Sequence, residues 1–114
     1  MAHPLGRLSS GRAFDAVYEQ GAVYNGPLFV LRVLPNASGE VRWGFAVGKR
    51  IAPLSTQRNR ARRRLREAAR GFLVRPGNDL IVTVKAAGLD APYEDLVAGL
   101  ERLLQRAGAL EEAG

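Results

Sequence analysis

The most unusual chemistry in this sequence lies in one short segment, RNRARRRLREAAR, which runs from Arg58 to Arg70. The segment holds seven arginines and one acidic residue, Glu67, whereas the other 101 residues hold ten basic and ten acidic side chains. The whole net charge of +6 therefore lies in this segment. Positive charge concentrated in one place, with a pI near 10.7, is typical of a protein that binds a polyanion.

The segment has the pattern of an amphipathic helix, which we expect over residues 57–73 with Ser55 or Thr56 as its N-cap. Arg58 falls in line with the apolar stripe, but in the first turn, where the core face opens to solvent. The other arginines fan around the remaining surface. The stripe itself covers about 100° of the helix and should face the core; it consists of Ala61, Leu65, Ala68, Ala69 and Phe72.

The arginines of this helix repel one another. Four pairs are spaced i,i+4, and together they cost about 1–2 kcal/mol. Phosphates would turn this repulsion into attraction, because a guanidinium pairs with a phosphate through two parallel hydrogen bonds. A solvated charged face is the simplest alternative, but ordinary surface salt bridges require charges of both signs. The pattern therefore favours nucleic-acid binding.

Arginine-rich helices bind RNA and DNA alike, so this composition does not choose between them. A DNA-recognition helix is expected to carry a mixture of Asn, Gln and Ser among its arginines, and the predominance of arginine in this helix disfavours DNA.

No group of residues is typical of a catalytic centre. The single histidine, His3, lies near the N-terminus, and the sequence has no cysteine, so a histidine triad and a thiolate metal site are excluded. The segment 44–50, GFAVGKR, superficially resembles a phosphate-binding loop, but it lacks the required spacing and has Arg50 in place of Ser or Thr. If the protein takes part in a reaction, another component must supply the reactive groups.

The chain of 114 residues is expected to form a single domain, 1–114, with residues 1–7 and 109–114 disordered. We predict a helix that begins after Ser9 or Ser10 and ends at Gly21, strands over 27–34 and 41–48, the arginine helix, a buried strand over 78–86 and a last helix that Asp90 caps. A short extra strand is expected near 23–24. No apolar run could span a bilayer and no signal peptide is visible, so a cytoplasmic location is expected.

The segment FAVGKRIAPLSTQRNRARRRLREAAR resembles the signature of the protein subunit of bacterial ribonuclease P. That signature is a strand, a Gly-Lys-Arg type of turn, a short loop, Arg-Asn-Arg, further basic residues and Arg-Glu. The similarity extends to AFDAVYEQG, LFVLRVL and NDLIVTVKA, and it covers about residues 7–107. The chain departs from the family in the loop 52–57, which is one residue longer, and at Arg32, where the family often has an aromatic side chain.

The resemblance implies an α/β (α+β) two-layer sandwich in the order αβββαβα, with a small central sheet and a left-handed βαβ crossover. It also implies a function as the protein component of the ribonuclease P ribonucleoprotein, an endonuclease that removes the 5′ leader of precursor tRNA. The catalytic RNA would carry the chemistry with Mg²⁺ bound mainly by RNA phosphates, and the protein alone would be inactive. Its partners would be that RNA and precursor tRNA, without membrane or DNA.

Two alternatives remain from the residues themselves. The first is a structural RNA-binding protein of the ribosomal type, with no role in cleavage. The second is a protein-only nuclease, which the lack of clustered acids or histidines disfavours.

Two sets of site residues are expected, and no catalytic or metal-binding residue lies in the protein. The leader-binding cleft would contain Phe14, Tyr18, Arg32 and Lys85, and the two rings would either stack unpaired bases or fill the core. Trp43, Phe45 and Phe72 are expected to be core residues. The RNA-binding set consists of Lys49, Arg50, Arg58, Asn59, Arg60, Arg62, Arg63 and Arg66.

Overall fold

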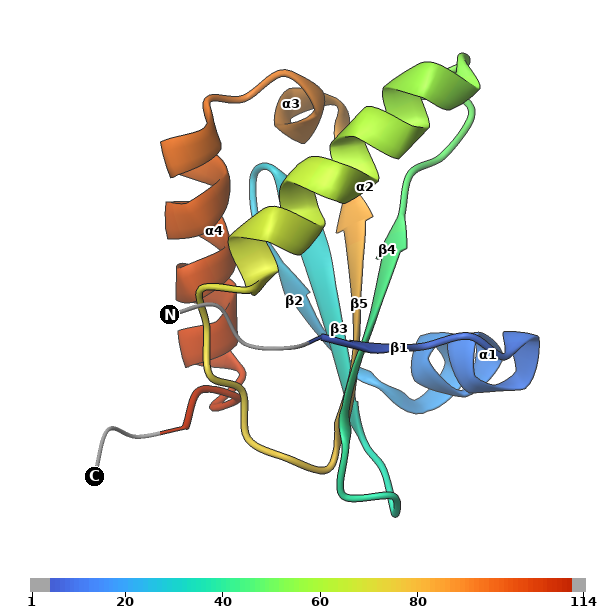
Figure 1. The fold of residues 1–114 in the computed structure, drawn as a ribbon, viewed down its shortest axis with the longest axis vertical. Coiled ribbons are helices and arrows are strands. Elements are labelled where there is room, and N and C mark those ends of the chain that lie inside the picture. Colours follow the sequence, from blue (N-terminus) through green and yellow to red (C-terminus); the bar gives the residue numbers. More distant parts are fainter. Residues whose placement is uncertain (1–4, 112–114) are drawn as a thin grey trace.

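A computed structural model describes residues 5–111, which form one five-stranded sheet with helices on both of its faces (Figure 1). The expected order αβββαβα is confirmed, and β1 and α3 are short elements that we did not predict. In chain order the elements are β1 (Gly6–Arg7), α1 (Gly11–Gln20), β2 (Ala22–Asn25), β3 (Phe29–Pro35), β4 (Val41–Ala46), α2 (Ser55–Ala69), β5 (Asn78–Val84), α3 (Ala86–Leu89) and α4 (Tyr93–Arg106).

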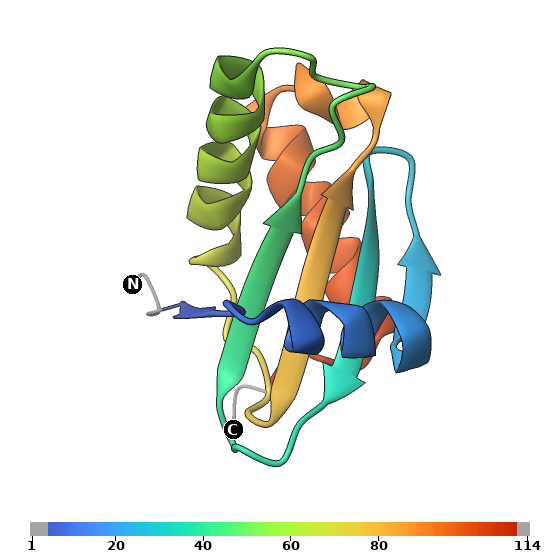
Figure 2. The same ribbon diagram turned by 90° about the vertical axis from the view of Figure 1, so that its right-hand side faces the viewer.

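The sheet has the strand order β1-β4-β5-β3-β2 and mixes parallel and antiparallel pairs. β4 is parallel to β1 and β5, whereas β3 is antiparallel to β5 and β2. Figure 2 views the sheet from the α1 side, where β5 lies to the right of β4 and both strands run upward. Because α2 joins them behind the sheet, this crossover is left-handed, as the resemblance implied and against the general preference for right-handed crossovers.

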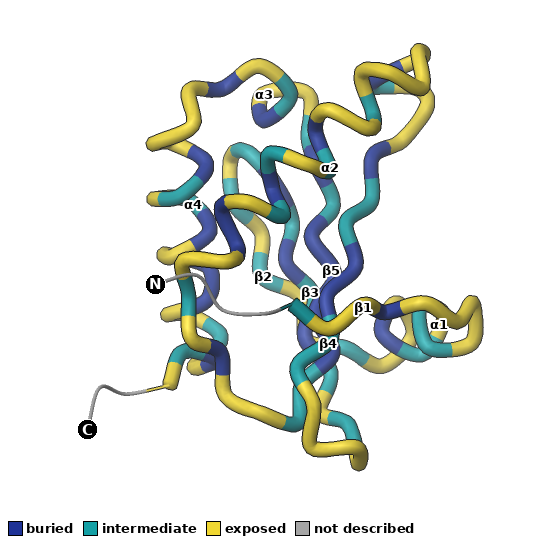
Figure 3. Tube along the Cα trace, in the orientation of Figure 1, coloured by how far each residue is buried: buried dark blue, intermediate teal, exposed yellow. Residues whose placement is uncertain are grey.

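The alternation of side chains along the strands gives the sheet two apolar faces. On β3 the buried residues Phe29, Leu31 and Val33 face the larger core, which α2 and α4 cover. On β5, Ile81 points to the opposite face and packs with Leu8 and with Val17 of α1 in a smaller cluster. The helices α2 and α4 turn buried stripes toward the sheet and toward each other (Figure 3). α1 thus adds a partial third layer to the expected two-layer sandwich.

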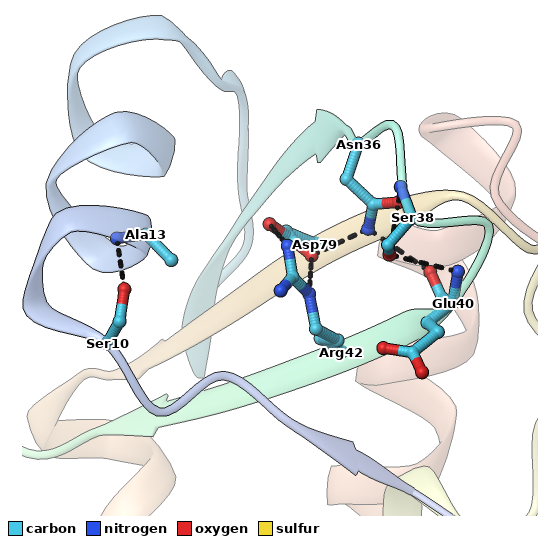
Figure 4. Close-up of polar contacts among 7 residues, drawn as sticks. All are labelled: Ser10, Ala13, Asn36, Ser38, Glu40, Arg42 and Asp79. Atoms are coloured by element: carbon cyan, nitrogen blue, oxygen red, sulfur yellow. Dashed lines mark hydrogen bonds and ion pairs between the residues drawn. The ribbon is translucent and has the colours of Figure 1, made fainter.

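The helix ends follow the expected capping at three points. Ser10 caps α1, and its Oγ accepts a hydrogen bond from the N–H of Ala13 at 3.0 Å (Figure 4). Gly21 ends this helix as expected. Gly108 follows α4 with a φ of +64°, a conformation that glycine adopts without strain.

The N-caps of α2 and α4 differ from the prediction. α2 is capped by Leu54 rather than by Ser55 or Thr56, because the Gln57 Oε1 reaches back and accepts the N–H of Leu54 at 3.1 Å. The N-cap of α4 is Pro92, whose fixed backbone suits a helix start. Asp90 instead ends the unpredicted helix α3.

Parts of the two terminal segments that we expected to be disordered are placed in the fold. Gly6–Arg7 pairs with the edge of β4, and a Cβ on Gly6 would lie 2.3 Å from the Val41 carbonyl oxygen, so the close approach requires glycine. Ala109 is buried and Leu110 pairs with Val74. Residues 1–4, which include His3, and 112–114 lie outside the described residues. Within residues 5–111, the helices are too short and polar to cross a membrane.

Candidate nucleic-acid interface

Two arginines of α2 hold loops of the protein itself. The Nη1 atom of Arg58 donates hydrogen bonds to the carbonyl oxygens of Ala52 and Pro53, at 2.8 and 2.9 Å. The half-buried guanidinium of Arg64 donates to the carbonyl oxygens of Leu89, at 3.3 Å, and Ala91. The hydrogen bonds of Arg58 therefore hold the loop that precedes α2 against this helix. Those of Arg64 hold the connection from α3 to α4 in the same way.

We expected the side chain of Arg58 to neutralise RNA phosphate, and the structure adds a role in holding the loop before α2. A helical wheel places Arg58 in line with the apolar stripe. The carbonyl groups that accept its hydrogen bonds belong to a loop outside the helix, so the periodicity of the helix does not predict them. Arg64, which we did not include among the site residues, has the same kind of structural role. Its acceptors are about 25 residues further along the chain.

Arg58→Ala is expected to lower the free energy of unfolding by about 1–2 kcal/mol, because two carbonyl groups lose a charged donor. Arg63→Ala is the matched control, since Arg63 is exposed on the same helix, and it should change stability by less than about 0.5 kcal/mol. Urea denaturation of both variants measures the difference. Equal stability of the two would show that the hydrogen bonds of Arg58 do not support the loop.

Other arginines of α2 meet acidic groups only weakly. Arg60 Nη1 lies 3.7 Å from Asp90 Oδ1, and the two side chains are 60% and 86% exposed. Arg70 lies 3.6 Å from Glu67, one turn away. Exposed pairs of this kind contribute about 0–1 kcal/mol and are screened by salt. These contacts therefore leave Arg60 and Arg70 accessible to a stronger anion.

Arg62 and Arg66 contact neutral side chains. Arg62 Nη1 donates to Asn59 Oδ1 at 2.9 Å, which fixes the side chain without balancing its charge. Arg66 lies over the ring of Phe45, with 5.7 Å from its Cζ to the ring centroid. Arg63 is exposed. The predicted RNA-binding residues Asn59, Arg62, Arg63 and Arg66 thus share the surface of one helix.

The turn before α2 adds two more cations. Lys49 and Arg50 are both exposed and follow the end of β4. Figure 1 shows this turn beside the first turn of α2, at the same end of the molecule. The free N–H groups of a helix start favour anions at this place. The structure therefore places the predicted basic residues on one helix and on the turn that precedes it.

Two of the predicted cleft residues, Phe14 and Tyr18, belong to α1, which crosses the other face of the sheet (Figure 2). Tyr18 is 44% exposed, and the guanidinium of Arg32 lies over its ring at 4.9 Å. Arg32 Nη1 also approaches Thr83 Oγ1 at 3.5 Å. Lys85 is half-buried and follows β5, two residues after Thr83. Tyr18 and Arg32 are thus in contact, and Lys85 lies beyond them at the end of the central strand.

Phe14 has a different environment from Tyr18. It is half-buried, and a Cβ on Gly44 would lie 2.6 Å from its Cζ atom, so its ring packs directly on the backbone of β4. Phe14 also belongs to the smaller apolar cluster with Val17 and Ile81. Of the two interpretations that the sequence left open, this position favours packing for Phe14, whereas Tyr18 presents its ring to solvent.

The structure reveals a partly buried ion pair that sequence reasoning missed. Arg42 Nε and Nη2 donate to the two carboxylate oxygens of Asp79 at 2.8 and 2.9 Å, and Asn36 Nδ2 donates to Asp79 Oδ1 at 2.7 Å (Figure 4). The hydrogen bonds to Asp79 raise the pKa of Arg42 above its ordinary value. Asp79 is the one buried charged residue among those described. An aspartate at the start of an otherwise apolar strand was the available signal.

A mixed sheet that carries one helix with an excess of uncompensated arginines defines a polyanion-binding α+β domain, and comparisons with known proteins specify the family. The family model for ribonuclease P matches residues 3–108. The ribonuclease P protein component of Symbiobacterium thermophilum is 40% identical over 111 residues, which are 95% of this chain and 96% of that protein. The same component of Herpetosiphon aurantiacus is 40% identical and covers 89% of this chain and 83% of its own length.

Solved structures agree with this fold. The RNase P protein of Staphylococcus aureus superposes with a TM-score of 0.81 at 22% identity, covering 95% of this chain and 100% of that one. The RNase P protein of Thermotoga maritima gives 0.76 at 24% identity and covers 88% and 96%. The chain belongs to the ribonuclease P protein family. RNA binding and tRNA processing as a subunit of a ribonuclease P ribonucleoprotein follow from that membership.

Proposed function

We propose that the chain binds the catalytic RNA of ribonuclease P through α2 and the turn before it, and the 5′ leader of precursor tRNA across the α1 face of the sheet. The holoenzyme would then hydrolyse one phosphodiester and release the mature tRNA 5′ end. The observation that carries this proposal is the surface of α2, where arginines outnumber acids by seven to one in residues 58–70.

The chemistry of the α2 surface suits RNA phosphates. Arg60, Arg62, Arg63 and Arg66 can each pair with a phosphate, and Lys49 and Arg50 extend the surface past the start of the helix. Asn59 presents an amide whose oxygen already accepts from Arg62, so its nitrogen remains a donor. Arg58 contributes mainly by holding the loop between the Lys49–Arg50 turn and α2.

The α1 face suits a single strand. The Arg32 guanidinium lies over the accessible ring of Tyr18. Unpaired bases stack on tyrosine rings and on guanidinium planes whatever their identity, which fits leaders of differing sequence. Lys85 follows the end of β5, two residues after Thr83, and can contact the leader backbone. Phe14 supports the site by fixing α1 on β4.

We propose further that the RNA subunit performs the chemistry, with Mg²⁺ held mainly by RNA phosphates. Mg²⁺ is a hard cation that commonly binds phosphate oxygens and keeps several waters. Among residues 5–111, no three His, Cys, Asp or Glu side chains gather in a set that could hold a metal ion. The role of the protein in this proposal is to bind and orient both RNAs.

A reconstitution experiment tests this division of labour. The purified, RNA-free protein is expected to leave precursor tRNA intact in the presence of Mg²⁺. Addition of the RNA subunit should give cleavage at the mature 5′ end, at a lower Mg²⁺ concentration or higher substrate affinity than the RNA alone. Cleavage by the RNA-free protein would contradict the proposal.

Tyr18→Ala is expected to weaken binding of the holoenzyme to leader-bearing precursor tRNA by about 5- to 100-fold, because one base loses its stacking partner. The slope of affinity against salt should not change, since stacking releases no counterions. Tyr93→Ala is the matched control, because Tyr93 is also 44% exposed but lies in the first turn of α4. Equal losses with mature tRNA, which has no leader, would show that Tyr18 does not contact the leader.

A further inference from the structure

A recess lies between β1, β4 and α2, on the face of the sheet opposite to α1. Its volume is about 380 Å³, and it is lined by Leu5, Gly6, Arg7, Trp43, Phe45 and Arg66. It forms because β1 pairs with Arg42 and Trp43 of β4 and does not continue to Phe45. After Leu8, the chain passes to α1 on the other face.

Aromatic rings and a guanidinium form one stack in this recess. The rings of Trp43 and Phe45 are nearly parallel, with 7° between their planes and 5.7 Å between their centroids. Arg66 continues the stack, with its Cζ also 5.7 Å from the Phe45 centroid. Trp43 is buried and anchors the stack in the core, whereas Phe45 and Arg66 are half-buried. We had expected Phe45 to be a core residue; it packs against the core and also lines the recess.

The charge of the recess is positive. Arg7 and Arg66 are the charged residues among the six that line it, and none of the six is acidic. Arg66 also belongs to the basic surface of α2, so the recess is continuous with the surface that is proposed to bind RNA. Arg7 is exposed at the other side of the opening. The apolar and aromatic side chains of the recess would contact a flat, uncharged ring system. Its two arginines would contact phosphates on either side of that ring.

We propose that this recess accepts one unpaired nucleotide of RNA, whose base packs against Phe45 and stacks on the guanidinium of Arg66 while Arg7 contacts a neighbouring phosphate. Bases in loops and bulges of RNA are commonly bound by such stacking. The proposal rests on the RNA-binding function proposed above and adds a base-binding site on the face of the sheet opposite to Tyr18. The nucleotide can come from the RNA subunit or from precursor tRNA.

The test compares Phe45→Leu, which keeps an apolar side chain without the aromatic face, with Phe45→Tyr, which keeps the ring. Phe72→Leu is the matched control, because Phe72 is a half-buried phenylalanine that packs against the core outside the recess. The dissociation constant is measured for a transcript of the RNA subunit alone, and for precursor tRNA bound by the reconstituted holoenzyme. Chemical probing of unpaired nucleotides accompanies both measurements.

Phe45→Leu should bind one of the two RNAs about 5- to 50-fold more weakly than Phe72→Leu, with an unchanged salt slope. Phe45→Tyr should bind like wild type, and the nucleotide that loses protection in Phe45→Leu identifies which RNA enters the recess. Arg7→Gln, an exposed change that leaves the packing intact, should reduce the salt slope by somewhat less than one.

Binding of both RNAs by Phe45→Leu and Arg7→Gln as tightly as by wild type would overturn this site and leave the α2 interface standing. Failure of the wild-type protein to bind either RNA would instead overturn the proposed function itself. If Phe45→Leu unfolds the protein, the test rests on the slope of RNA affinity against salt in Arg7→Gln. An unchanged slope in that variant overturns the proposed site.

Discussion

Replacing Arg60, Arg62, Arg63 and Arg66 together with alanine is expected to weaken binding of the RNA subunit by about 100- to 1,000-fold at 0.1 M salt. Each phosphate contact with a single strand releases about 0.7 counterion, and duplex regions release about 0.9. Four lost contacts therefore reduce the slope of log K against log[salt] by about 3. The loss should be similar for different RNA sequences, because phosphate contacts carry no sequence information.

The same quadruple variant is expected to be as stable as wild type or slightly more stable. Its arginines include an i,i+4 pair, Arg62 and Arg66, whose repulsion disappears. A salt titration of RNA affinity and a urea titration of folding measure the two effects separately. Arg12→Ala and Arg102→Ala, which remove exposed arginines of α1 and α4, serve as controls and should change the slope less. An unchanged slope in the quadruple variant would show that α2 does not bind phosphate.

Arg42→Ala is expected to lower the free energy of unfolding by about 2–4 kcal/mol. The side chain of Asp79 is only 6% exposed, so its carboxylate would remain buried, with Asn36 as the remaining side-chain donor among residues 5–111. An uncompensated buried charge usually costs about 3–5 kcal/mol, and the lower range applies here because Arg42 is itself 31% exposed and water can enter.

A double-mutant cycle tests the origin of this loss. Asp79→Asn removes the charge and preserves the shape, so the Arg42→Ala, Asp79→Asn variant should recover much of the stability that Arg42→Ala alone loses. Urea denaturation of the four proteins gives the coupling energy. A loss below about 1 kcal/mol in Arg42→Ala would show that the pair does not hold the 36–40 turn against β4 and β5.

Long periodic elements could be predicted from the sequence, because their own residues determine them. The stripe of Ala61, Leu65 and Ala68 places α2 on the sheet correctly, and Gly108 marks the end of α4. The elements β1 and α3 are two and four residues long and have no periodicity of their own. They form because β4 offers an open edge to Gly6–Arg7 and because the chain must turn between β5 and α4.

The roles of individual arginines could not be predicted in the same way. A helical wheel places Arg58 in line with the apolar stripe and Arg63 on the opposite side, but it does not show that the side chain of Arg58 donates to the carbonyl oxygens of Ala52 and Pro53. Likewise, Trp43 and Phe45 share one face of β4, yet β1 covers the strand only as far as Trp43. In both cases the deciding neighbour comes from another segment. The left-handed crossover also came from the family resemblance, since general chain physics favours the other hand.

The most direct test of the central claim is to purify the tagged protein from its own cells at low salt and to sequence the RNA that accompanies it. We expect one structured RNA in stoichiometric amount, together with tRNA precursors that still carry their 5′ leaders, and we expect that RNA to cleave the precursors when the protein is added back. Recovery of ribosomal RNA in its place, without any RNA that cleaves precursor tRNA, would contradict the claim.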